Sequence, residues 1–273
     1  MRRMPWLTVA PNGARPGKAN HPAVPVALDE LAACAAECHA AGAEAIHLHV
    51  RDAAGGHVLD AELFNRAAAA VERATGGAMW VQATTEAVGR YSAADQRALL
   101  PRLRVPAVSL GLRELIPDAS EEAAAAEALA ALTGRGVSVQ YFLYEPAEIP
   151  RFADLVRRGV VPDVALDVLF ALGHYTIGDT ETEVLVAFLS AWADSGLAGR
   201  AEWAACAFGR TETRALAAVL ALGGKARVGF ENSMLMADGS RAPDNAARVA
   251  EIVALARAMG HEAIRKPEAA LQN

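Results

Sequence analysis

The sequence predicts an α/β fold, a TIM-type (β/α)8 barrel that forms a single domain over residues 1–273. Apolar strand-like runs alternate with alanine-rich amphipathic stretches from one end of the chain to the other. The strand-like runs are almost continuously apolar, which is typical of parallel strands whose two faces are both buried. The length of 273 residues is close to the roughly 250 residues of this fold. No G-x-G-x-x-G motif follows the first strand, which disfavours a doubly wound sheet.

Eight strand–helix units can be placed along the chain from runs of Val, Ile, Leu and aromatic residues and from helical spacing of apolar residues. The predicted strands cover residues 6–10, 45–50, 79–84, 107–112, 137–144, 164–172, 202–207 and 226–230. The predicted helices cover residues 28–41, 61–75, 93–103, 121–133, 148–158, 181–194, 213–222 and 245–259. No linker, internal repeat or low-complexity segment indicates a second domain.

Composition narrows the class of protein. Hydrophobic residues make up 53% and charged residues 21% of the chain, as in a globular enzyme. The net charge of -6 argues against nucleic acid as a partner. No run approaches the roughly 20 apolar residues of a membrane span, so we expect no membrane partner. The first residues lead into a strand and not into a signal peptide, and we therefore expect a cytoplasmic protein.

The lysine and cysteine residues disfavour a Schiff-base mechanism and a cysteine-bound metal. Lys18, Lys225 and Lys266 are the only lysines, and none lies clearly within a predicted strand, which disfavours a class I aldolase. The sulfur-containing candidates are Cys34, Cys38 and Cys206. We expect them to be buried, reduced thiols and not metal ligands.

The most informative segment is A-I-H-L-H-V-R-D, residues 45–52. As a strand it directs His47, His49 and Arg51 to one face and three aliphatic residues to the other. Same-face neighbours lie only about 6.5–7 Å apart, so two imidazoles can converge on one metal ion. The alternative is a pair of core histidines that are hydrogen-bonded to backbone groups.

The barrel would bring a third ligand to these histidines. Catalytic groups in this fold gather at the C-terminal ends of the strands. Glu231 directly follows the last strand, and strands eight, one and two are neighbours in a closed barrel. Glu231 can therefore meet His47 and His49. Two histidines and a carboxylate form a known zinc set with an open position, although ferrous enzymes use the same ligands. A solvated loop carboxylate is the alternative for Glu231.

Several motifs together resemble the family of β-keto acid cleavage enzymes, which includes 3-keto-5-aminohexanoate cleavage enzyme. The most specific are H-L-H-V-R-D at residues 47–52 and R-V-G-F-E at residues 227–231, and the resemblance extends over almost the whole chain. Further matching segments are residues 8–14, 41–43, 82–85, 223–224 and 240–245. The resemblance implies a zinc-bearing TIM barrel, usually homo-oligomeric. It also implies condensation of a β-keto acid with acetyl-CoA, followed by cleavage to acetoacetate and a new acyl-CoA.

The resemblance also implies roles for single residues. His47, His49 and Glu231 would hold zinc, which would act as a Lewis acid on the keto acid. Arg227 would be the active-site arginine, where a structural ion pair is the alternative. Thr84 would stand where the family often has serine.

Three departures from the family pattern change the expected chemistry. Arg15 replaces a loop glutamate, and Asn232 replaces an aspartate that follows the metal-ligand glutamate. Residues 84–87 read T-T-E-A where the family has a glycine pair. Because asparagine cannot act as a carboxylate base, we hypothesise that Glu86 takes that catalytic role; its alternative is a structural partner for an arginine. Arginine at position 15 suits a second carboxylate or a phosphate, so the preferred substrate should lack a cationic amine.

Other residues at the predicted barrel mouth complete the candidate site. For substrate binding these are Asn12, Ser109 and Arg113 in addition to Arg15, with Gly111 and Tyr144 as further pocket residues. His174 and Tyr175 follow strand six and could add another imidazole. Arg210 and the free N–H groups of residues 208–211 could receive a CoA phosphate.

Two other functional classes stay open at this point. A zinc enzyme without acetyl-CoA could be a hydrolase, a retro-aldol lyase or a decarboxylase that acts on a small carboxylate. A non-catalytic barrel that binds a small ligand is the other possibility. Asn232 in place of the family aspartate is the feature that supports both alternatives. The two histidines, the carboxylate and the arginine at one barrel mouth weigh against the non-catalytic barrel, and the family reaction stays the leading interpretation.

Overall fold

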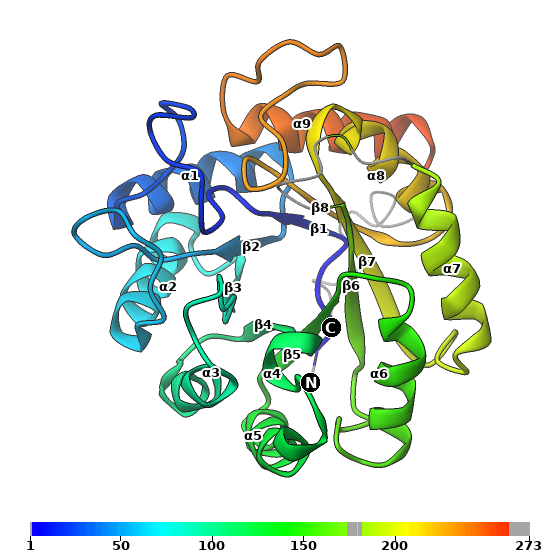
Figure 1. Ribbon diagram of the computed structural model, residues 1–273. Coiled ribbons are helices and arrows are strands. Elements are labelled where there is room, and N and C mark those ends of the chain that lie inside the picture. Colours follow the sequence, from blue (N-terminus) through cyan, green and yellow to red (C-terminus); the bar gives the residue numbers. More distant parts are fainter. Residues whose placement is uncertain (1, 174–178, 180–181, 262–273) are drawn as a thin grey trace, which may run out of the picture.

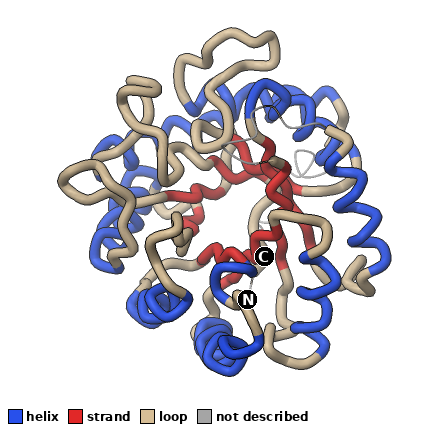
Figure 2. The backbone as a smooth tube through the Cα atoms, in the orientation of Figure 1, coloured by secondary structure: helices blue, strands red, loops and turns tan. Residues whose placement is uncertain are grey.

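The computed structural model describes residues 2–173, 179 and 182–261, and it confirms the predicted barrel. Eight parallel strands close in the order β1-β2-β3-β4-β5-β6-β7-β8. Figure 1 shows the strands as a central ring with the helices packed around it, and Figure 2 shows the loops that extend beyond the ring. Among the described residues, no helix is both long and apolar enough to cross a membrane.

The elements follow the predicted alternation of strand and helix. The strands are β1 (Leu7–Val9), β2 (Ala45–Leu48), β3 (Trp80–Thr84), β4 (Ala107–Gly111), β5 (Ser138–Leu143), β6 (Asp167–Leu172), β7 (Glu202–Ala207) and β8 (Lys225–Val228). The α-helices are α1 (Leu28–Ala41), α2 (Ala61–Thr75), α3 (Ala93–Leu99), α4 (Leu112–Leu115), α5 (Glu122–Gly134), α6 (Glu148–Arg157), α7 (Val184–Asp194), α8 (Glu212–Ala221) and α9 (Asn245–Ala258). Short 3-10 turns are η1 (Leu100–Arg102), η2 (Ala119–Glu121) and η3 (Gly209–Thr211).

Several strands are shorter than predicted because the backbone turns where the apolar sequence continues. The last predicted strand, residues 226–230, ends at Val228 in β8, and Gly229 follows with a φ of 141°. The strand predicted over residues 164–172 begins only at Asp167, after Ala165 with a φ of 45°. The helix predicted over residues 93–103 is divided into α3 and η1, since Pro101 has no N–H group to continue an α-helix.

The core between strands and helices is built from large apolar side chains. Ile46 and Leu48 point outward from β2 and are fully buried. Phe64 on α2, Phe152 on α6 and Phe188 on α7 are also fully buried. Burial of each such side chain contributes about 1.5–3 kcal/mol to the free energy of unfolding. The helix layer is thereby held against the strands, and the strand ends keep a fixed geometry.

The interior of the barrel combines an apolar cluster with buried polar side chains. The cluster lies toward the C-terminal ends of β5, β6 and β7 and is formed by Phe142, Leu169, Ala171, Ala204, Cys206 and Phe208. Buried polar side chains occupy other interior positions on strands around the barrel, such as Gln82 on β3, Gln140 on β5 and Asp167 on β6. Buried polar groups need partners, so these positions are where specific interactions are concentrated.

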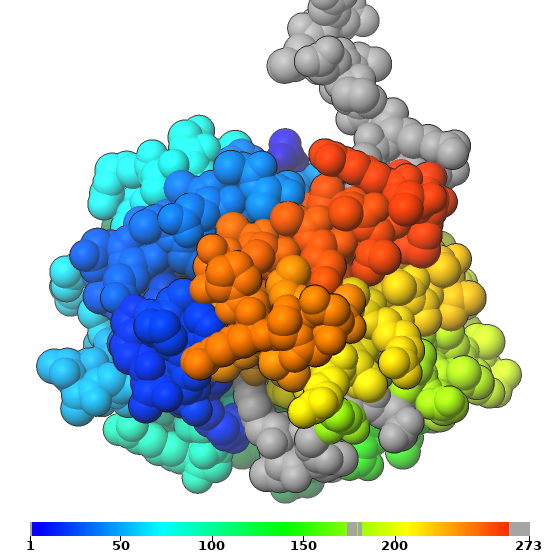
Figure 3. Space-filling view, turned by 90° about the horizontal axis from the view of Figure 1, so that it is seen from above, coloured from blue at the N-terminus to red at the C-terminus, as the bar shows by residue number. Residues whose placement is uncertain are grey.

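The loop that joins β8 to α9 packs against the loop that joins β1 to α1. Phe230 and Ala242 form a buried apolar cluster with Val24. His21 Nε2 donates to the carbonyl oxygen of Ala242 at 3.0 Å, and its ring lies 4.6 Å from the Phe230 ring. In Figure 3 the orange β8–α9 segment lies directly beside the blue N-terminal segment. The β1–α1 and β8–α9 loops therefore support each other at the barrel mouth.

Candidate active site

His47, His49 and Glu231 converge at the C-terminal end of the barrel, as the sequence predicts. Their ligand atoms lie within 4.8 Å of one another, and all three side chains are buried. His47 belongs to β2, His49 follows the end of that strand, and Glu231 follows β8. Within the part of the chain that the structure describes, this His–His–Glu cluster is the one group of such side chains that could hold a metal ion.

The spacing of the cluster fits a tetrahedral metal ion. His47 Nε2 and His49 Nε2 are 3.2 Å apart, and each lies 3.5 Å from Glu231 Oε2. Ligands at about 2.0–2.1 Å from zinc in a tetrahedral arrangement lie about 3.3–3.4 Å from each other. The three donor atoms therefore need almost no movement to bind one zinc ion.

The far side of each imidazole is held by a hydrogen bond. His47 Nδ1 is 2.8 Å from Gln82 Oε1, and His49 Nδ1 is 3.3 Å from His57 Nδ1. The other nitrogen of His57, Nε2, donates to the backbone carbonyl of Glu86 at 3.0 Å. His57 Nδ1 therefore carries a lone pair and accepts the proton of His49 Nδ1. The free lone pair of His49 is consequently at Nε2, where it faces Glu231.

Burial keeps the two imidazoles in the neutral form that binds metals. Burial lowers the pKa of His47 to about 4 and that of His49 to about 3, against the opposing effect of the Glu231 carboxylate. For Glu231, burial would raise the pKa, but the Arg227 guanidinium and the two histidines hold it well below its usual range. At neutral pH the cluster consists of two neutral imidazoles and one carboxylate.

Arg227 lies beside this cluster and points into the pocket. Its Nη2 atom is 3.1 Å from Glu231 Oε1 and donates to Cys206 Sγ at 3.2 Å. The guanidinium carbon lies 5.0 Å from the centre of the Phe142 ring. The side chain is buried and lines the pocket together with Phe142 and Glu231. A guanidinium held in this way presents a fixed positive charge to a bound anion.

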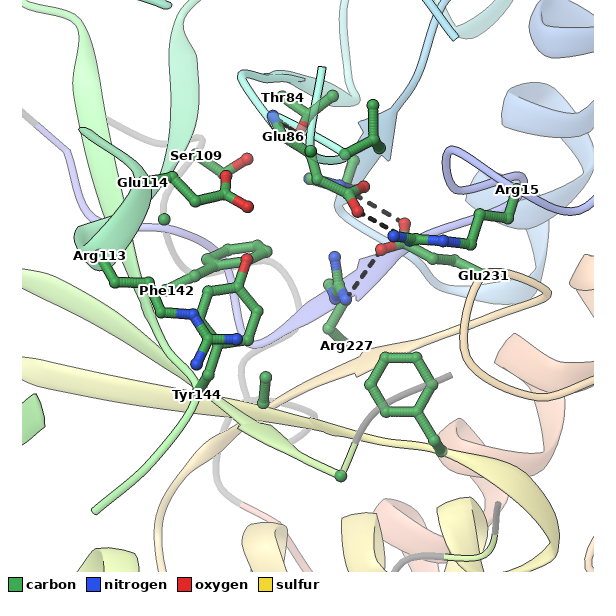
Figure 4. Close-up of a pocket in the computed structure, with 17 residues that line it drawn as sticks. Arg15, Thr84, Glu86, Ser109, Arg113, Glu114, Phe142, Tyr144, Arg227 and Glu231 are labelled. Carbon is green, nitrogen blue, oxygen red and sulfur yellow. Dashed lines mark hydrogen bonds and ion pairs between the residues drawn. The ribbon is translucent and has the colours of Figure 1, made fainter. Parts of the chain in front are cut away.

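Two of the departures from the family pattern meet in an ion pair. Arg15 Nη1 and Glu86 Oε1 are 2.9 Å apart, and Figure 4 shows the Arg15 guanidinium beside the Glu86 carboxylate at the edge of the pocket. Glu86 Oε2 also lies 3.7 Å from His49 Nε2. Burial and the nearby Glu231 raise the pKa of Glu86 to about 7, although Arg15 opposes this shift. Glu86 is thus both the structural partner of an arginine and a carboxylate next to the cluster.

The remaining wall of the pocket comes from β3, β4 and β5. Thr84 and Ser109 line it, and Thr84 Oγ1 accepts a hydrogen bond from the backbone N–H of Glu86 at 3.0 Å. Arg113 lies flat against Tyr144, with its guanidinium carbon 4.1 Å from the ring centre, as Figure 4 shows. Gly111 also lines the pocket. These positions agree with the predicted pocket wall.

Other predicted site residues have different surroundings. The amide of Asn12 donates to the carbonyls of Pro25 and His49 and accepts from the His49 N–H, so Asn12 holds the His49 backbone instead of lining the pocket. Asn232 is buried next to Glu231 outside the pocket wall, and neither atom of its amide has a hydrogen-bond partner among the described residues.

The proposed phosphate contacts near η3 are partly occupied. The N–H of Arg210 donates to Asp179 Oδ1 at 2.6 Å, and the N–H of Gly209 donates to the Asn232 carbonyl at 3.2 Å. These two N–H groups are therefore not free, contrary to the expectation for residues 208–211. His174 and Tyr175 lie outside the described residues.

Comparison with known proteins identifies the family. Residues 5–270 match the family described as beta-keto acid cleavage enzyme. The chain belongs to this family. It is 27% identical over 271 residues to a 3-keto-5-aminohexanoate cleavage enzyme of Fusobacterium nucleatum subsp. nucleatum. The match covers 97% of this chain and 96% of that protein. It is 26% identical over 263 residues to a 3-oxoadipate:acetyl-CoA acetyltransferase of Cupriavidus necator, with 93% and 89% covered.

Solved structures with the same fold are more distant. A ternary complex of ObcA with a C4-CoA adduct and oxalate has a TM-score of 0.68 at 15% identity. That match covers 88% of this family member but only 65% of the ObcA chain. A type I 3-dehydroquinate dehydratase from Clostridium difficile has a TM-score of 0.61 at 10% identity, with 93% of each chain covered. At these identities the likeness concerns the barrel alone.

The sequence analysis missed several contacts that shape the site of this enzyme. His57, from the loop after β2, was not selected because no periodicity places a loop residue. Gln82 could have been found, since it faces the barrel interior and is the register partner of His47. Phe142 contacts Arg227 from β5, across the barrel, and Cys206 contacts it from the neighbouring strand β7. Arg51 leaves the histidine face and donates to carbonyls of the β1–α1 loop, such as that of Ala14.

The close approach of Gly229 to Ala10, just before Glu231, can be tested by substitution. A Cβ atom on Gly229 would lie 2.5 Å from the carbonyl oxygen of Ala10, a backbone atom that cannot move aside. We expect Gly229→Ala to displace Glu231 and to lower both the free energy of unfolding and zinc affinity. Gly239→Ala is the matched control, because Gly239 also has a positive φ but nothing lies within 4 Å of its Cβ position. Urea unfolding should show Gly229→Ala to be about 2 kcal/mol or more less stable than the control. Equal stability and zinc affinity of the two variants would contradict this account.

Proposed function

We propose that the protein is a zinc-dependent enzyme that exchanges acyl groups between a β-keto acid and acetyl-CoA. The acid R–CO–CH2–COO⁻ and acetyl-CoA would give R–CO–CoA and acetoacetate. The observation that carries the proposal is the buried His–His–Glu cluster with Arg227 at its side, in a member of the β-keto acid cleavage enzyme family. The relative named 3-oxoadipate:acetyl-CoA acetyltransferase supports acetyl-CoA as cosubstrate. Family membership makes the protein an enzyme and disfavours a non-catalytic ligand-binding barrel.

Several of the pocket residues have a proposed role in this reaction. Zinc, when bound by His47, His49 and Glu231, would supply a Lewis acid for the ketone and carboxylate oxygens of the substrate. Arg227 would hold a substrate carboxylate or an oxyanion with its fixed guanidinium. Thr84 would position the Glu86 backbone through its hydrogen bond to that N–H.

The catalytic base is a separate part of the proposal. Asn232 cannot accept the proton, and Glu86 is the pocket carboxylate that lies within 3.7 Å of the cluster without a proposed role as metal ligand. We assign the removal of the substrate proton to Glu86, with Arg15 holding the carboxylate in place.

A substrate with a second anionic group fits the pocket best. Arg15 and Arg113 both line it, and each adds positive charge away from Arg227. Arginine pairs with carboxylates through two parallel hydrogen bonds, whereas it repels an amine. The name of the relative that acts on 3-oxoadipate, a β-keto acid with a second carboxylate, supports the same substrate class. Arg210 stays a proposed contact for a CoA phosphate through its side chain. A homo-oligomeric state and a cytoplasmic location also stay proposals.

A zinc-dependent reaction without CoA is the second candidate. The feature that favours it is Asn232, which stands where the resemblance to the family implies an aspartate. Its amide is buried and without a hydrogen-bond partner among the described residues. Hydrolysis, retro-aldol cleavage and decarboxylation would each release product from the keto acid alone.

The experiment that decides between the two candidates is turnover of a panel of β-keto acids with and without acetyl-CoA, on protein of measured metal content. We expect acyl-CoA and acetoacetate in equal amounts, and loss of both after chelation with recovery by zinc. His47→Ala should lack zinc, whereas the control His39→Ala, on α1 away from the cluster, should retain it. Products formed without acetyl-CoA would support the second candidate, and full activity of metal-free protein would exclude both.

The proposed base is tested by Glu86→Gln. Glutamine keeps the size and the polar contact with Arg15 but cannot accept a proton at neutral pH. We expect kcat to fall by about 100-fold or more, since general bases contribute about 10²–10⁴. Zinc content should stay near one per chain, because Glu86 is not one of the three ligands. A variant that keeps full turnover would remove Glu86 from the mechanism.

The proposed substrate class is tested by Arg15→Gln. We expect kcat/KM to fall by about 10-fold or more for a β-keto acid with a second carboxylate, as for loss of one charge-assisted hydrogen bond. For a β-keto acid whose R group is uncharged the decrease in kcat/KM should be smaller. The ratio of kcat/KM for the two substrates removes the effect of the variant on Glu86. Arg157→Gln, exposed on α6, is the control. Preference of the wild-type enzyme for cationic β-keto acids would contradict the assignment.

A further inference from the structure

A line of buried side chains crosses the barrel interior below the His–His–Glu cluster. His47 Nδ1 is 2.8 Å from Gln82 Oε1 on β3. Gln82 Nε2 donates to Gln140 Oε1 on β5 at 3.1 Å, and Gln140 Nε2 donates to Asp167 Oδ1 on β6 at 2.7 Å. Each of these four residues is buried, with at most 2% of its surface exposed. We call Gln82, Gln140 and Asp167 the interior relay.

The far end of the relay has a chemical direction that is set by the ionised carboxylate of Asp167. Burial raises the pKa of this carboxyl, whereas Lys225 and the Gln140 amide favour its ionised form. Asp167 Oδ2 accepts from the N–H of Met4 at 3.1 Å and from Lys225 Nζ at 2.8 Å. Lys225 also pairs with Glu202. Every neighbour that contacts the Asp167 carboxylate in these bonds is a donor, and a carboxylate is an acceptor at both oxygens. Gln140 must therefore present its NH2 group, and not its carbonyl, to Asp167.

The orientation of the Gln140 amide determines the orientation of Gln82 and the position of the proton on His47. If Gln140 directs its NH2 group to Asp167, its carbonyl faces Gln82. Gln82 must then donate its own NH2 group to Gln140 and direct its carbonyl to His47. A carbonyl can only accept, so His47 carries a proton on Nδ1. The lone pair of His47 is consequently on Nε2, the atom that faces His49 and Glu231.

The strand between the two glutamines permits their contact. Gln82 and Gln140 come from β3 and β5, which are separated by β4. The residue of β4 in register with Gln82 is Ala107, and its methyl group leaves space inside the barrel. Gln140 and Asp167 are in register on the adjacent strands β5 and β6. The relay therefore depends on side chains from three strands and on a small residue in a fourth.

We propose that the interior relay is a positioning device that uses the buried Asp167 carboxylate to fix the tautomer of His47 for metal binding. In many metal sites a carboxylate contacts the ligating histidine directly and raises metal affinity by about 10–100-fold. Here two amides transmit the same preference across the barrel. The inference rests on the proposed metal site and adds three residues that act through His47.

The proposal is tested by a variant that should reverse the direction of the hydrogen bonds between position 167 and His47. In Asp167→Asn, the amide oxygen at position 167 should stay with Lys225 and Met4, and the NH2 group should face Gln140. Gln140 and Gln82 would then both turn over, and Gln82 would donate to His47 Nδ1. The proton of His47 would move to Nε2, the atom that is needed for the metal. We expect the zinc Kd to rise about 10-fold or more in a chelator competition assay.

The double variant Asp167→Asn with Gln82→Glu should reverse this loss. A carboxylate at position 82 accepts both from the turned Gln140 and from His47 Nδ1, so the zinc Kd should return to within about threefold of wild type. A merely structural role of Asp167 gives no reason for such rescue. Val139→Ala is the control, since Val139 lies on the same strand as Gln140 but packs among the outer apolar residues. It should lower stability and leave the Kd unchanged.

A second readout does not need the metal. Nitrogen chemical shifts of ¹⁵N-histidine-labelled, metal-free protein should report a proton on Nδ1 of His47 in the wild type and on Nε2 in Asp167→Asn. The same tautomer in both proteins, or an unrescued Kd in the double variant, would overturn the relay. If the wild type bound no zinc, the proposed function would fail, while the tautomer change would still decide the relay by itself.

Discussion

The hydrogen bonds that close the barrel between β8 and β1 are the constraint on which the site depends. Ala10 donates from its backbone N–H to Val228 at 2.8 Å, and Glu231 donates back to Ala10 at 3.0 Å. Glu231 lies more than 180 positions after His47 and His49 in the sequence. Only closure places them on either side of one strand. The close approach also explains why residue 229 is glycine, because any Cβ there would collide with the Ala10 carbonyl.

The buried polar side chains of the barrel interior hold the site residues that this closure brings together. Buried polar atoms are costly unless they are paired, and pairing them restricts the orientation of each side chain. His57 and the Glu86 carbonyl hold one imidazole, and the interior relay holds the other. The apolar cluster places the Phe142 ring against the Arg227 guanidinium. Metal ligands and the guanidinium are thus held by groups that do not themselves touch the substrate.

Arg15 and Glu86 depend on each other in the structure. They form an ion pair at the pocket mouth. Burial and the nearby Glu231 raise the pKa of Glu86, and the Arg15 guanidinium opposes this shift. Both side chains line the pocket, so the pair contributes to the charge that the pocket presents to a ligand.

The sequence by itself determined the barrel, the order of its elements and the faces of its strands, because these follow from local periodicity and length. It also determined the His–His–Glu cluster and Arg227, since strand ends meet at one mouth in this fold. Only the tertiary structure decided that Asn12 holds the His49 backbone, that Arg15 pairs with Glu86, and that Asp167 is connected to His47. Those contacts join residues from separate strands and loops, and their geometry depends on barrel register and side-chain packing, which no local pattern encodes.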